Sequence, residues 1–323
     1  MSIEKKNNAA WPSFLNTLNP HEQHKIFKNI LPNIKHLLLD EKIPLSNNIL
    51  NTIQKLYIPF AHWLVTQPHK KPLVVGISGS QGSGKSTLNI ILSLILEQCF
   101  QQKVVSFSID DLYKTQQQRH ELADKIHPLL LTRGVPGTHN VDLGISLFKQ
   151  LTQPTSSHCQ IPVFDKTSDN PLPTSQWTSV NTDCDIILFE GWCVGATAQT
   201  ENELIPAINS LEENEDKTGC WRRYVNRQLQ TTYAELFAFI DIQLLLKIPD
   251  FNKVLEWRGL QEKKLIDKNK KNMHQMMNEA EIKHFIMHFE RLTKHMLNKM
   301  PEHGDVIFEL DTQQQTCNVI TNR

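Results

Sequence analysis

The 323-residue sequence lacks an excess of charge of either sign, because 34 Lys and Arg residues balance 34 Asp and Glu residues. Proteins that bind nucleic acid or anionic membranes concentrate positive charge, so we expect neither as a partner. No apolar run approaches the roughly 18 residues of a transmembrane helix. The first residues contain no apolar stretch of the kind found in secretory signals. We therefore expect a cytoplasmic protein.

Cysteine pairs at a metal-binding or redox spacing are also absent. The six cysteines are scattered, with no Cys-x-x-Cys pair, which predicts reduced thiols rather than a zinc site or a disulfide framework. Hydrophobic residues make up 39% of the chain and charged residues 21%, as in ordinary soluble globular proteins. The length allows one large domain or two small ones, each with its own core.

Short apolar runs separated by helical patterns predict an α/β fold. The runs suited to buried parallel strands are residues 72–77, 103–109, 184–190, 239–248 and 305–310. Because these runs alternate with helical segments, we predict a three-layer sandwich. The stretch GSQGSGKST, between the first run and the helical segment after it, makes this sandwich one of the P-loop NTPase type. Its mostly parallel, five-stranded sheet would have helices on both faces.

The remaining segments predict how the chain is organised around this sheet. Residues 1–70 have apolar residues at helical spacing and are predicted to form an N-terminal helical extension. Residues 71–323 would form the main domain, with a substrate-binding insertion at 111–183 and a lid with an amphipathic helix at 250–275. The polar segment 199–220 is expected to be a surface excursion.

The stretch GSQGSGKST has the Gly-x-x-x-x-Gly-Lys-Ser/Thr spacing of a phosphate-binding loop, between a predicted strand and a predicted helix. Backbone N–H groups of such a loop surround phosphates, and its glycines allow a close approach. We predict that ATP and Mg²⁺ are the cofactors, that Lys85 reaches the β- and γ-phosphates as a catalytic residue, and that Ser86 ligates the metal. The predicted nucleotide-binding residues are Gly79, Ser80, Gln81, Gly82, Ser83, Gly84, Lys85, Ser86 and Thr87. The alternative is a structural glycine-rich turn.

Carboxylates follow two of the predicted strands, at the edge where open α/β sheets bind ligands. Asp110 and Asp111 follow the second strand, where a carboxylate can accept the proton of an attacking hydroxyl group. We predict Asp110 as the catalytic base and Asp111 as a substrate-binding residue, although the sequence leaves open which is the base, and either could cap a helix. Glu190 ends the third strand and is predicted to bind Mg²⁺; a solvated strand end is the alternative.

Several side chains in the insertion and the lid are candidates for substrate binding and charge neutralisation. Tyr113, Arg133, His139 and Lys166 are predicted to contact the substrate, and Arg133 could clamp a carboxylate or phosphate with two hydrogen bonds. The alternatives are a packed tyrosine, a hydrogen-bonded loop histidine and a solvated lysine. Arg258, beside Trp257, is predicted to close over the transferring phosphoryl group as a catalytic residue.

The order of motifs along residues 70–310 resembles that of the D-glycerate 3-kinase family. The motifs are GSQGSGKST, SIDDLY, RGVPGTHN, IPVFDKTSD, ILFEGW and EWRGLQE. The resemblance implies ATP-dependent phosphorylation of D-glycerate to 3-phosphoglycerate. By position in the motifs, Asp110 matches the catalytic base of the wider kinase group, Glu190 its magnesium-binding acid and Arg258 a lid arginine. Glycerate carries a carboxylate, for which Arg133 and Lys166 are candidate partners.

Two other functions remain open from the sequence. The first is a kinase with another small hydroxyl acceptor, a nucleoside or a pantothenate-like compound. A nucleoside would need aromatic stacking partners, and the insertion offers only Tyr113, Phe164 and Trp177. The second is a non-catalytic, ATP-binding regulatory protein, which would not need Asp110 as a base. A monomer and a homodimer are both compatible with the sequence.

Overall fold

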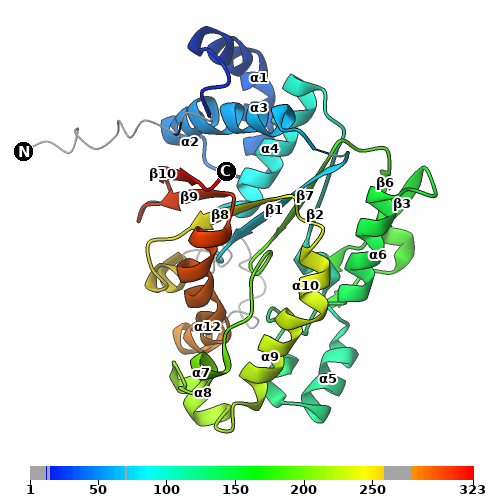
Figure 1. The fold of residues 1–323 in the computed structure, drawn as a ribbon, viewed down its shortest axis with the longest axis vertical. Helices are drawn as coiled ribbons and strands as arrows, with labels where there is room; N and C mark the ends of the chain where they lie inside the picture. Colours follow the sequence, from blue (N-terminus) through cyan, green and yellow to red (C-terminus); the bar gives the residue numbers. More distant parts are fainter. Residues whose placement is uncertain (1–11, 13–14, 70, 258–277) are drawn as a thin grey trace, which may run out of the picture.

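The computed structural model describes residues 12, 15–69, 71–257 and 278–323, and its main feature is a central twisted sheet (Figure 1). The sheet has six strands in the order β10–β9–β8–β1–β7–β2. Their bounds are β1 Leu73–Gly79, β2 Val104–Ser108, β7 Ile186–Gly191, β8 Ile242–Lys247, β9 Val306–Leu310 and β10 Thr316–Thr321.

The five strands predicted from apolar runs are all present, and they are parallel. β1 pairs with β7 and β8, β2 pairs with β7, and β8 pairs with β9. The sixth strand, β10, was not predicted; it runs antiparallel to β9 at the edge of the sheet. Only Val319 of β10 is buried, so this edge strand has no apolar run that would identify it. The predicted α/β fold with a mostly parallel sheet is confirmed.

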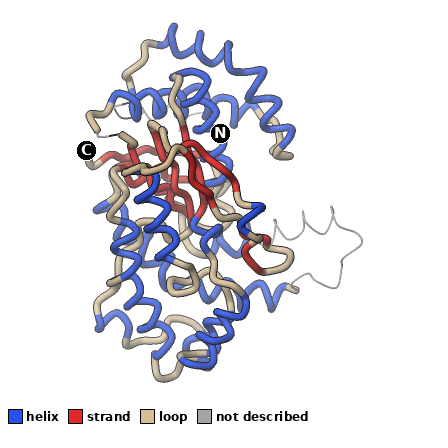
Figure 2. The backbone as a smooth tube through the Cα atoms, turned by 90° about the vertical axis from the view of Figure 1, so that its right-hand side faces the viewer, coloured by secondary structure: helices blue, strands red, loops and turns tan. Residues whose placement is uncertain are grey.

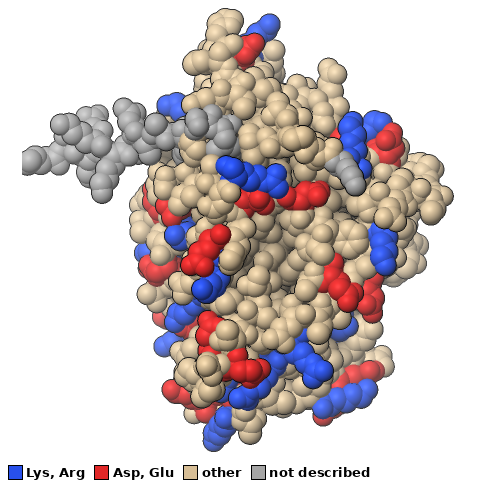
Figure 3. All heavy atoms as spheres, viewed as in Figure 1, with Lys and Arg blue, Asp and Glu red and all other residues tan. Residues whose placement is uncertain are grey.

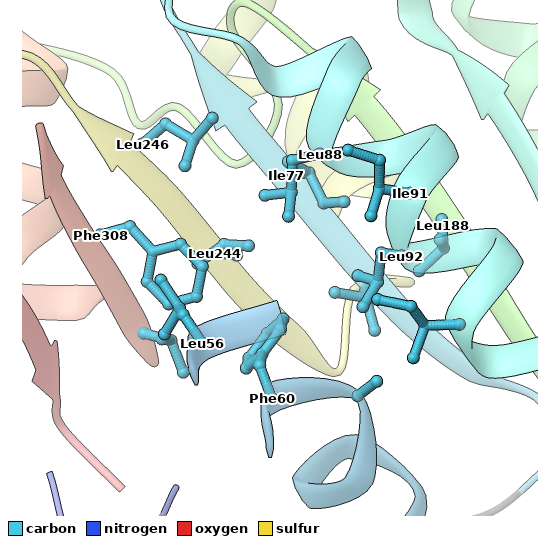
Figure 4. Close-up of a cluster of buried hydrophobic side chains, with 14 of the residues drawn as sticks. Leu56, Phe60, Ile77, Leu88, Ile91, Leu92, Leu188, Leu244, Leu246 and Phe308 are labelled. Carbon is cyan, nitrogen blue, oxygen red and sulfur yellow. The ribbon is translucent and has the colours of Figure 1, made fainter. Parts of the chain in front are cut away.

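The N-terminal helices and α4 cover one face of the sheet. The helices on this face are α1 Pro20–Asp40, α2 Asn47–Thr52, the π-helix η3 Ile53–Tyr57, α3 Ile58–Thr66 and α4 Lys85–Phe100. Leu56 and Phe60 meet Leu244 and Phe308 of the sheet in one hydrophobic core (Figure 4), where the rings of Phe60 and Phe308 lie 5.3 Å apart. Each such side chain stabilises the fold by about 1.5–3 kcal/mol when buried. The N-terminal helices are therefore integral to the core beneath the sheet.

Figure 2 shows helices on both sides of the strands. The hydrophobic core on the other face of the sheet combines strand residues with residues of four helices from the middle and end of the chain. They are α6 Val141–Thr152, α9 Cys220–Gln230, α10 Thr232–Phe237 and α12 Glu279–His303. Phe148 of α6 packs on Phe107 and Phe189 of the sheet, with ring centroids 5.3 and 5.2 Å apart. Within the described residues, every helix is too short or too polar to cross a membrane.

The predicted insertion at 111–183 contains α6 and several shorter elements. They are η4 Ile109–Leu112, α5 Gln116–Lys125, η5 Pro128–Leu131, η6 Thr174–Gln176, the hairpin of β3 His158–Ile161 with β6 Thr178–Asn181, and the hairpin of β4 Phe164–Asp165 with β5 Asn170–Pro171. The β3–β6 hairpin lies near the amino end of β2, because Asp183, two residues after β6, pairs with Lys103. The β4–β5 hairpin approaches η4, because the N–H of Phe164 donates to Asp111. This hairpin and η4 therefore place polar side chains beside the carboxyl end of β2.

Most of residues 199–220 are exposed, as expected for a polar surface excursion, but two acidic residues of this segment are not. This segment contains α7 Glu201–Leu204 and α8 Ser210–Glu215, and its Glu212 and Asp216 are fully buried. Arg291 donates two hydrogen bonds to Glu212, of 2.7 and 2.6 Å, and Arg222 pairs with Asp216 at 3.0 Å. A carboxylate can be buried at acceptable cost when a guanidinium group pairs with it.

On the face shown in Figure 3, acidic and basic side chains alternate without a large patch of one sign.

Candidate active site

The predicted phosphate loop lies between β1 and α4, as the sequence indicated. β1 ends at Gly79 and α4 begins at Lys85. Gly84 caps α4 with φ +87°, and Gly82 has φ +80°, both in the left-handed region that favours glycine. A Cβ atom on Gly82 would lie 2.7 Å from the Cβ of Trp257, so no larger residue fits there. The positive end of α4 therefore faces the loop.

Three polar atoms of this loop are buried without a hydrogen-bond partner. They are the Oγ atoms of Ser80 and Ser83 and the Oε1 of Gln81. Folded proteins rarely leave buried polar atoms unpaired, and such atoms require an explanation. Their concentration in one loop of the expected spacing indicates a site that a polar ligand completes.

Glu190 and Ser86 are adjacent, as expected for a magnesium site. Glu190 is the penultimate residue of β7, which pairs with β1, and its Oε1 accepts a hydrogen bond of 3.0 Å from the Ser86 hydroxyl. Its Oε2 is buried and has no hydrogen-bond partner. One carboxylate and one hydroxyl fit Mg²⁺, which takes its other ligands from phosphates and water. In the described parts of the chain, no group of three or more His, Cys, Asp or Glu side chains could hold a metal alone.

Asp110 is held by two donors at the carboxyl end of β2. Its Oδ1 accepts a hydrogen bond of 2.7 Å from the Tyr113 hydroxyl, and its Oδ2 accepts one of 2.9 Å from Lys166 Nζ. Burial raises the pKa of Asp110, but the charges of Lys166 and Lys85 lower it by more, and the resulting pKa is about 2. Asp110 is thus ionised at neutral pH and can accept a proton.

Asp111 has a different environment from its neighbour. Its Oδ2 accepts a hydrogen bond of 3.2 Å from the N–H of Ser108, and its Oδ1 accepts one of 3.4 Å from the N–H of Phe164. The first of these bonds is part of a capping box at the start of η4. Both carboxylate oxygens therefore accept hydrogen bonds from backbone N–H groups, and Asp111 is not among the residues that line the cleft described next.

A cleft of about 150 Å³ opens beside the loop. The cleft is lined by Gln81, Lys85, Asp110, Tyr113, Arg133, Lys166, Trp192, Phe285 and Phe289. The structure thus brings Tyr113, Arg133 and Lys166, three of the five predicted substrate-binding residues, next to Asp110 and Lys85. Asp111 and His139 lie outside this set.

His139 is buried behind Tyr113 rather than in the cleft. Its ring stacks on the Tyr113 ring with centroids 4.5 Å apart, and its Nδ1 lies 2.6 Å from the hydroxyl of Tyr233. Burial lowers the pKa of His139 to about 4, against an opposing effect of Asp110. A neutral histidine in this position supports the tyrosine that holds Asp110.

Two residues of the site were missed by the sequence analysis. Arg119, which is 2% exposed, donates a 2.5 Å hydrogen bond to Oδ2 of Asp169, and Arg133 donates to Oδ1 of the same carboxylate. Asp169 has φ +56°, an uncommon conformation for a residue other than glycine. The surrounding polar run DKTSDN resembles an ordinary surface turn, so no sequence signal identifies this bridge. The Asp169 carboxylate, which joins Arg119 to Arg133, orients the Arg133 side chain, which remains 31% exposed.

Arg258, the predicted lid arginine, lies outside the described residues. Its neighbour Trp257 is described and buried, and it lies against Gly82 of the loop. The chain is helical from 252 to 257. The end of this segment is therefore anchored at the loop.

Comparison with known proteins identifies relatives of the chain, although no protein-family profile matches it. The chain is 32% identical over 231 residues to the uncharacterized kinase mug58 of Schizosaccharomyces pombe, a match that covers 69% of this chain and 80% of that protein. It is 29% identical over 195 residues to the chloroplastic D-glycerate 3-kinase of Arabidopsis thaliana, which covers 58% of this chain and 40% of the plant protein.

A solved structure agrees with the fold. The D-glycerate 3-kinase from Cryptococcus neoformans superposes with a TM-score of 0.64 at 22% identity, over 82% of this chain and 96% of that one. At 22% identity this likeness shows the fold, whereas the mug58 and Arabidopsis matches confirm the resemblance that the motifs carry and identify an ATP-dependent kinase. The chain belongs to the D-glycerate 3-kinase family of P-loop kinases.

Proposed function

We propose that this kinase transfers the γ-phosphoryl group of ATP to D-glycerate and forms 3-phosphoglycerate. The observation that carries the proposal is the cleft, in which the ionised Asp110 lies with Lys85, Arg133 and Lys166 beside the phosphate loop. Three cationic side chains and one carboxylate give the cleft a net positive charge. Such a cleft favours an acceptor that has both a hydroxyl group and an anionic group.

Arg133 is the best partner for the carboxylate of glycerate. Lys166 is already paired with Asp110 at 2.9 Å, whereas Arg133 has five N–H donors and uses one of them on Asp169. A guanidinium group can bind a carboxylate through two parallel hydrogen bonds. The Arabidopsis relative is a D-glycerate 3-kinase, which supports the same acceptor.

The aromatic residues near the cleft do not favour a nucleoside acceptor. One face of the Tyr113 ring is covered by His139, and Phe164 packs edge-on against Tyr113 with Arg133 over its ring. Trp177 donates to the backbone oxygen of Leu172 and is not among the lining residues. Tyr113 and Phe164 are thus packed on protein groups, and Trp177 lies outside the cleft. The other aromatic lining residues, Trp192, Phe285 and Phe289, pack edge-on or tilted against one another. The volume of about 150 Å³ also suits a smaller acceptor than pantothenate.

The geometry supports direct transfer of the γ-phosphoryl group from ATP to the hydroxyl group of the acceptor. The acceptor hydroxyl oxygen forms a bond to the γ-phosphorus while the bond from that phosphorus to the β,γ-bridging oxygen breaks. Asp110 accepts the hydroxyl proton, and Lys85 neutralises charge on the departing diphosphate. A base with a pKa of about 2 suffices, because a loose phosphoryl-transfer transition state needs little activation of the hydroxyl.

Ser86 and Glu190 would hold the Mg²⁺ ion that accompanies ATP, since the unpartnered Oε2 of Glu190 and the Ser86 hydroxyl are suitable oxygen donors. When bound, the ion would withdraw charge from the phosphate oxygens. We assign Asp111 and His139 as positioning residues for Asp110 and Tyr113. The lid role of Arg258 and the 250–275 region, the cytoplasmic location and the monomer or homodimer state remain predictions from the sequence.

The first prediction concerns Lys166, which keeps Asp110 ionised. In the folded protein the pKa of Asp110 is below its ordinary value, so the carboxylate stays charged until the pH falls toward 2. Without Lys166, only Lys85 and Tyr113 oppose the increase in the pKa of Asp110 that burial causes, so this pKa should rise. Lys166→Met should therefore move the acidic limb of the kcat/KM profile to higher pH.

The measurement is kcat/KM for D-glycerate between about pH 3 and pH 8. Lys125→Met, at the exposed end of α5, is the control and should keep the wild-type profile. An unchanged acidic limb in Lys166→Met would mean that Lys166 does not control the charge of Asp110.

The second prediction tests the carboxylate of the acceptor. Arg133→Gln should raise KM for D-glycerate by about 10- to 100-fold and leave KM for ATP unchanged, because a charge-assisted pair is worth about 1.5–3 kcal/mol. Glycerol, which lacks the carboxylate, should be phosphorylated as poorly by the variant as by the wild type. Arg227→Gln, at an exposed position of α9, is the matched control. An equal loss for glycerol and D-glycerate would contradict the assigned contact.

A further inference from the structure

We propose that the N-terminal helices form the nucleoside half of the ATP site. The inference rests on the proposed use of ATP at the phosphate loop, and it gives a role to a segment whose function the sequence did not reveal. The site is a second cavity of about 270 Å³ beside the loop, called here the N-terminal cavity.

The cleft and the N-terminal cavity lie against different residues of the same loop and helix. Gln81 and Lys85 line the cleft, whereas Ser83, Gly84 and Thr87 line the N-terminal cavity. A nucleotide whose phosphates lie on the loop must direct its γ-phosphoryl group toward Asp110, which lies in the cleft. Its ribose and base must then leave the loop elsewhere, and the N-terminal cavity is directly accessible from the loop.

The two spaces differ in charge. The cleft contains Lys85, Asp110, Arg133 and Lys166. Among the described residues that line the N-terminal cavity, none is Lys, Arg, His, Asp or Glu. An anionic acceptor would have no counter-charge in the N-terminal cavity, and burying it there would be costly. A neutral nucleoside has no such need, so charge assigns the acceptor to the cleft and the nucleoside to the N-terminal cavity.

The walls of the N-terminal cavity have the composition of a nucleoside site. Ile49 of α2 and Leu246 and Leu310 at the ends of β8 and β9 supply apolar surface for the faces of a base. The turn at 313–315 between β9 and β10 consists of three glutamines, whose amides both donate and accept hydrogen bonds. Small-molecule sites combine apolar walls with a few polar groups in this way. Helix α2 and the β9–β10 hairpin, far apart in sequence, lie on the same side of the molecule (Figure 1).

A second feature of the N-terminal segment points to the same place. Residues Ile53–Tyr57 form a π-helix, closed by a hydrogen bond from the N–H of Ile58 to the oxygen of Ile53. Such segments are rare and frequently occur at functional sites. Here Ile53 and Leu56 are fully buried in the core, whereas Tyr57, at the end of the π-helix, lines the N-terminal cavity. The irregular turn thus presents an aromatic ring to the proposed nucleoside.

The experiment compares binding of ADP and pyrophosphate to the full chain by calorimetry, because only ADP has a nucleoside. The wild type should bind ADP at least tenfold more tightly than pyrophosphate. Tyr57→Ala removes the ring, and Thr52→Trp fills the N-terminal cavity from α2. Each variant should weaken ADP binding by about tenfold or more and leave pyrophosphate binding unchanged. Asn51→Trp, at the neighbouring exposed position that does not line the cavity, should bind ADP as the wild type does.

The other outcomes are distinguishable. If the wild type binds pyrophosphate as tightly as ADP, or if Thr52→Trp and Tyr57→Ala both keep wild-type ADP affinity, the phosphate loop stands and the nucleoside assignment is wrong. If both variants lose affinity for ADP and pyrophosphate equally, the helices act on the loop and not on a nucleoside, which also overturns the inference. If the wild type binds neither ADP nor pyrophosphate, the phosphate loop does not bind a nucleotide, and the proposed function and the inference that rests on it are both wrong. Thermal unfolding of each variant checks that it is folded.

Discussion

Replacing Asp110 with Asn is expected to lower kcat by about two to four powers of ten while ATP binds with nearly its wild-type affinity. The substitution keeps the size of the side chain but removes its charge, its ion pair with Lys166 and its ability to accept the proton. The carboxylate lies in the cleft, held by Tyr113 at 2.7 Å and by Lys166 at 2.9 Å. It does not belong to the phosphate loop, so the bound nucleotide should be little affected. The measurements are kcat with D-glycerate and the Kd of ATP.

Asp111→Asn is the matched control for this prediction. Asp111 is the adjacent residue in the chain, but its oxygens accept hydrogen bonds from the backbone of Ser108 and Phe164. An asparagine keeps one acceptor oxygen, so kcat should fall much less than in Asp110→Asn, and the main effect should be on thermal stability. If ATP affinity collapsed in Asp110→Asn, Asp110 would be a metal-binding or structural residue. If Asp111→Asn were the more damaged variant, the two roles would have to be exchanged.

Replacing Lys85 with Ala is expected to weaken ATP binding by tenfold or more and to lower kcat by about two powers of ten or more. Lys85 is the first residue of α4 and lines the cleft from the side of the loop. Its charge also helps to hold down the pKa of Asp110. The variant therefore loses an attraction for the phosphates and part of the field that keeps the base ionised. Calorimetric titration with ATP and steady-state kinetics measure the two effects.

Lys103→Ala is a suitable control for the loss of a lysine. Lys103 precedes β2 at the opposite end of the strand from Asp110 and pairs with the exposed Asp183. Exposed ion pairs contribute about 0–1 kcal/mol to stability, so this variant should bind ATP and turn over as the wild type does. Unchanged ATP binding in Lys85→Ala would contradict the assignment of the phosphate loop.

The parts of the fold that the sequence predicted are those with a strong local signal. Four of the five predicted strands, β1, β7, β8 and β9, are buried along most of their length and have apolar runs. β2, at one edge of the sheet, still has Val105 and Phe107 buried, whereas β10, at the other edge, has a single buried residue and was missed. The loop was recognised because its glycines and Lys85 occur at a fixed spacing. Asp110 and Glu190 were recognised because each directly follows an apolar strand, and parallel strands end at the same edge of a sheet.

The parts that the sequence did not predict depend on partners distant in the chain. Asp111 differs from Asp110 because a backbone N–H 53 positions away, that of Phe164, reaches its carboxylate. Asp169 connects Arg119 and Arg133 from a polar turn that has no distinctive pattern. Glu212 belongs to an acidic run that reads as exposed, yet it is buried because Arg291, 79 positions away, pairs with it. Because each of these contacts joins residues far apart in the sequence, no short sequence pattern indicates it.

The role of the N-terminal helices was hidden for a related reason. Their apolar spacing predicts helices but does not tell what the helices pack against or which cavity they border. The structure places Leu56 and Phe60 in the core beneath the sheet and Tyr57, between them in the chain, at the N-terminal cavity. One short segment therefore contributes both to the core and to the proposed nucleoside site.

The measurement that tests the central claim most directly is ADP release from Mg·ATP by the wild-type protein, with D-glycerate, uridine, pantothenate or ribulose 5-phosphate as acceptor and a control without acceptor. We predict that D-glycerate alone stimulates ADP release well above the control. Stimulation by uridine or pantothenate instead would contradict the assignment of the cleft. Tight ATP binding without stimulation by any of the four acceptors would contradict the account and favour a regulatory ATP-binding protein.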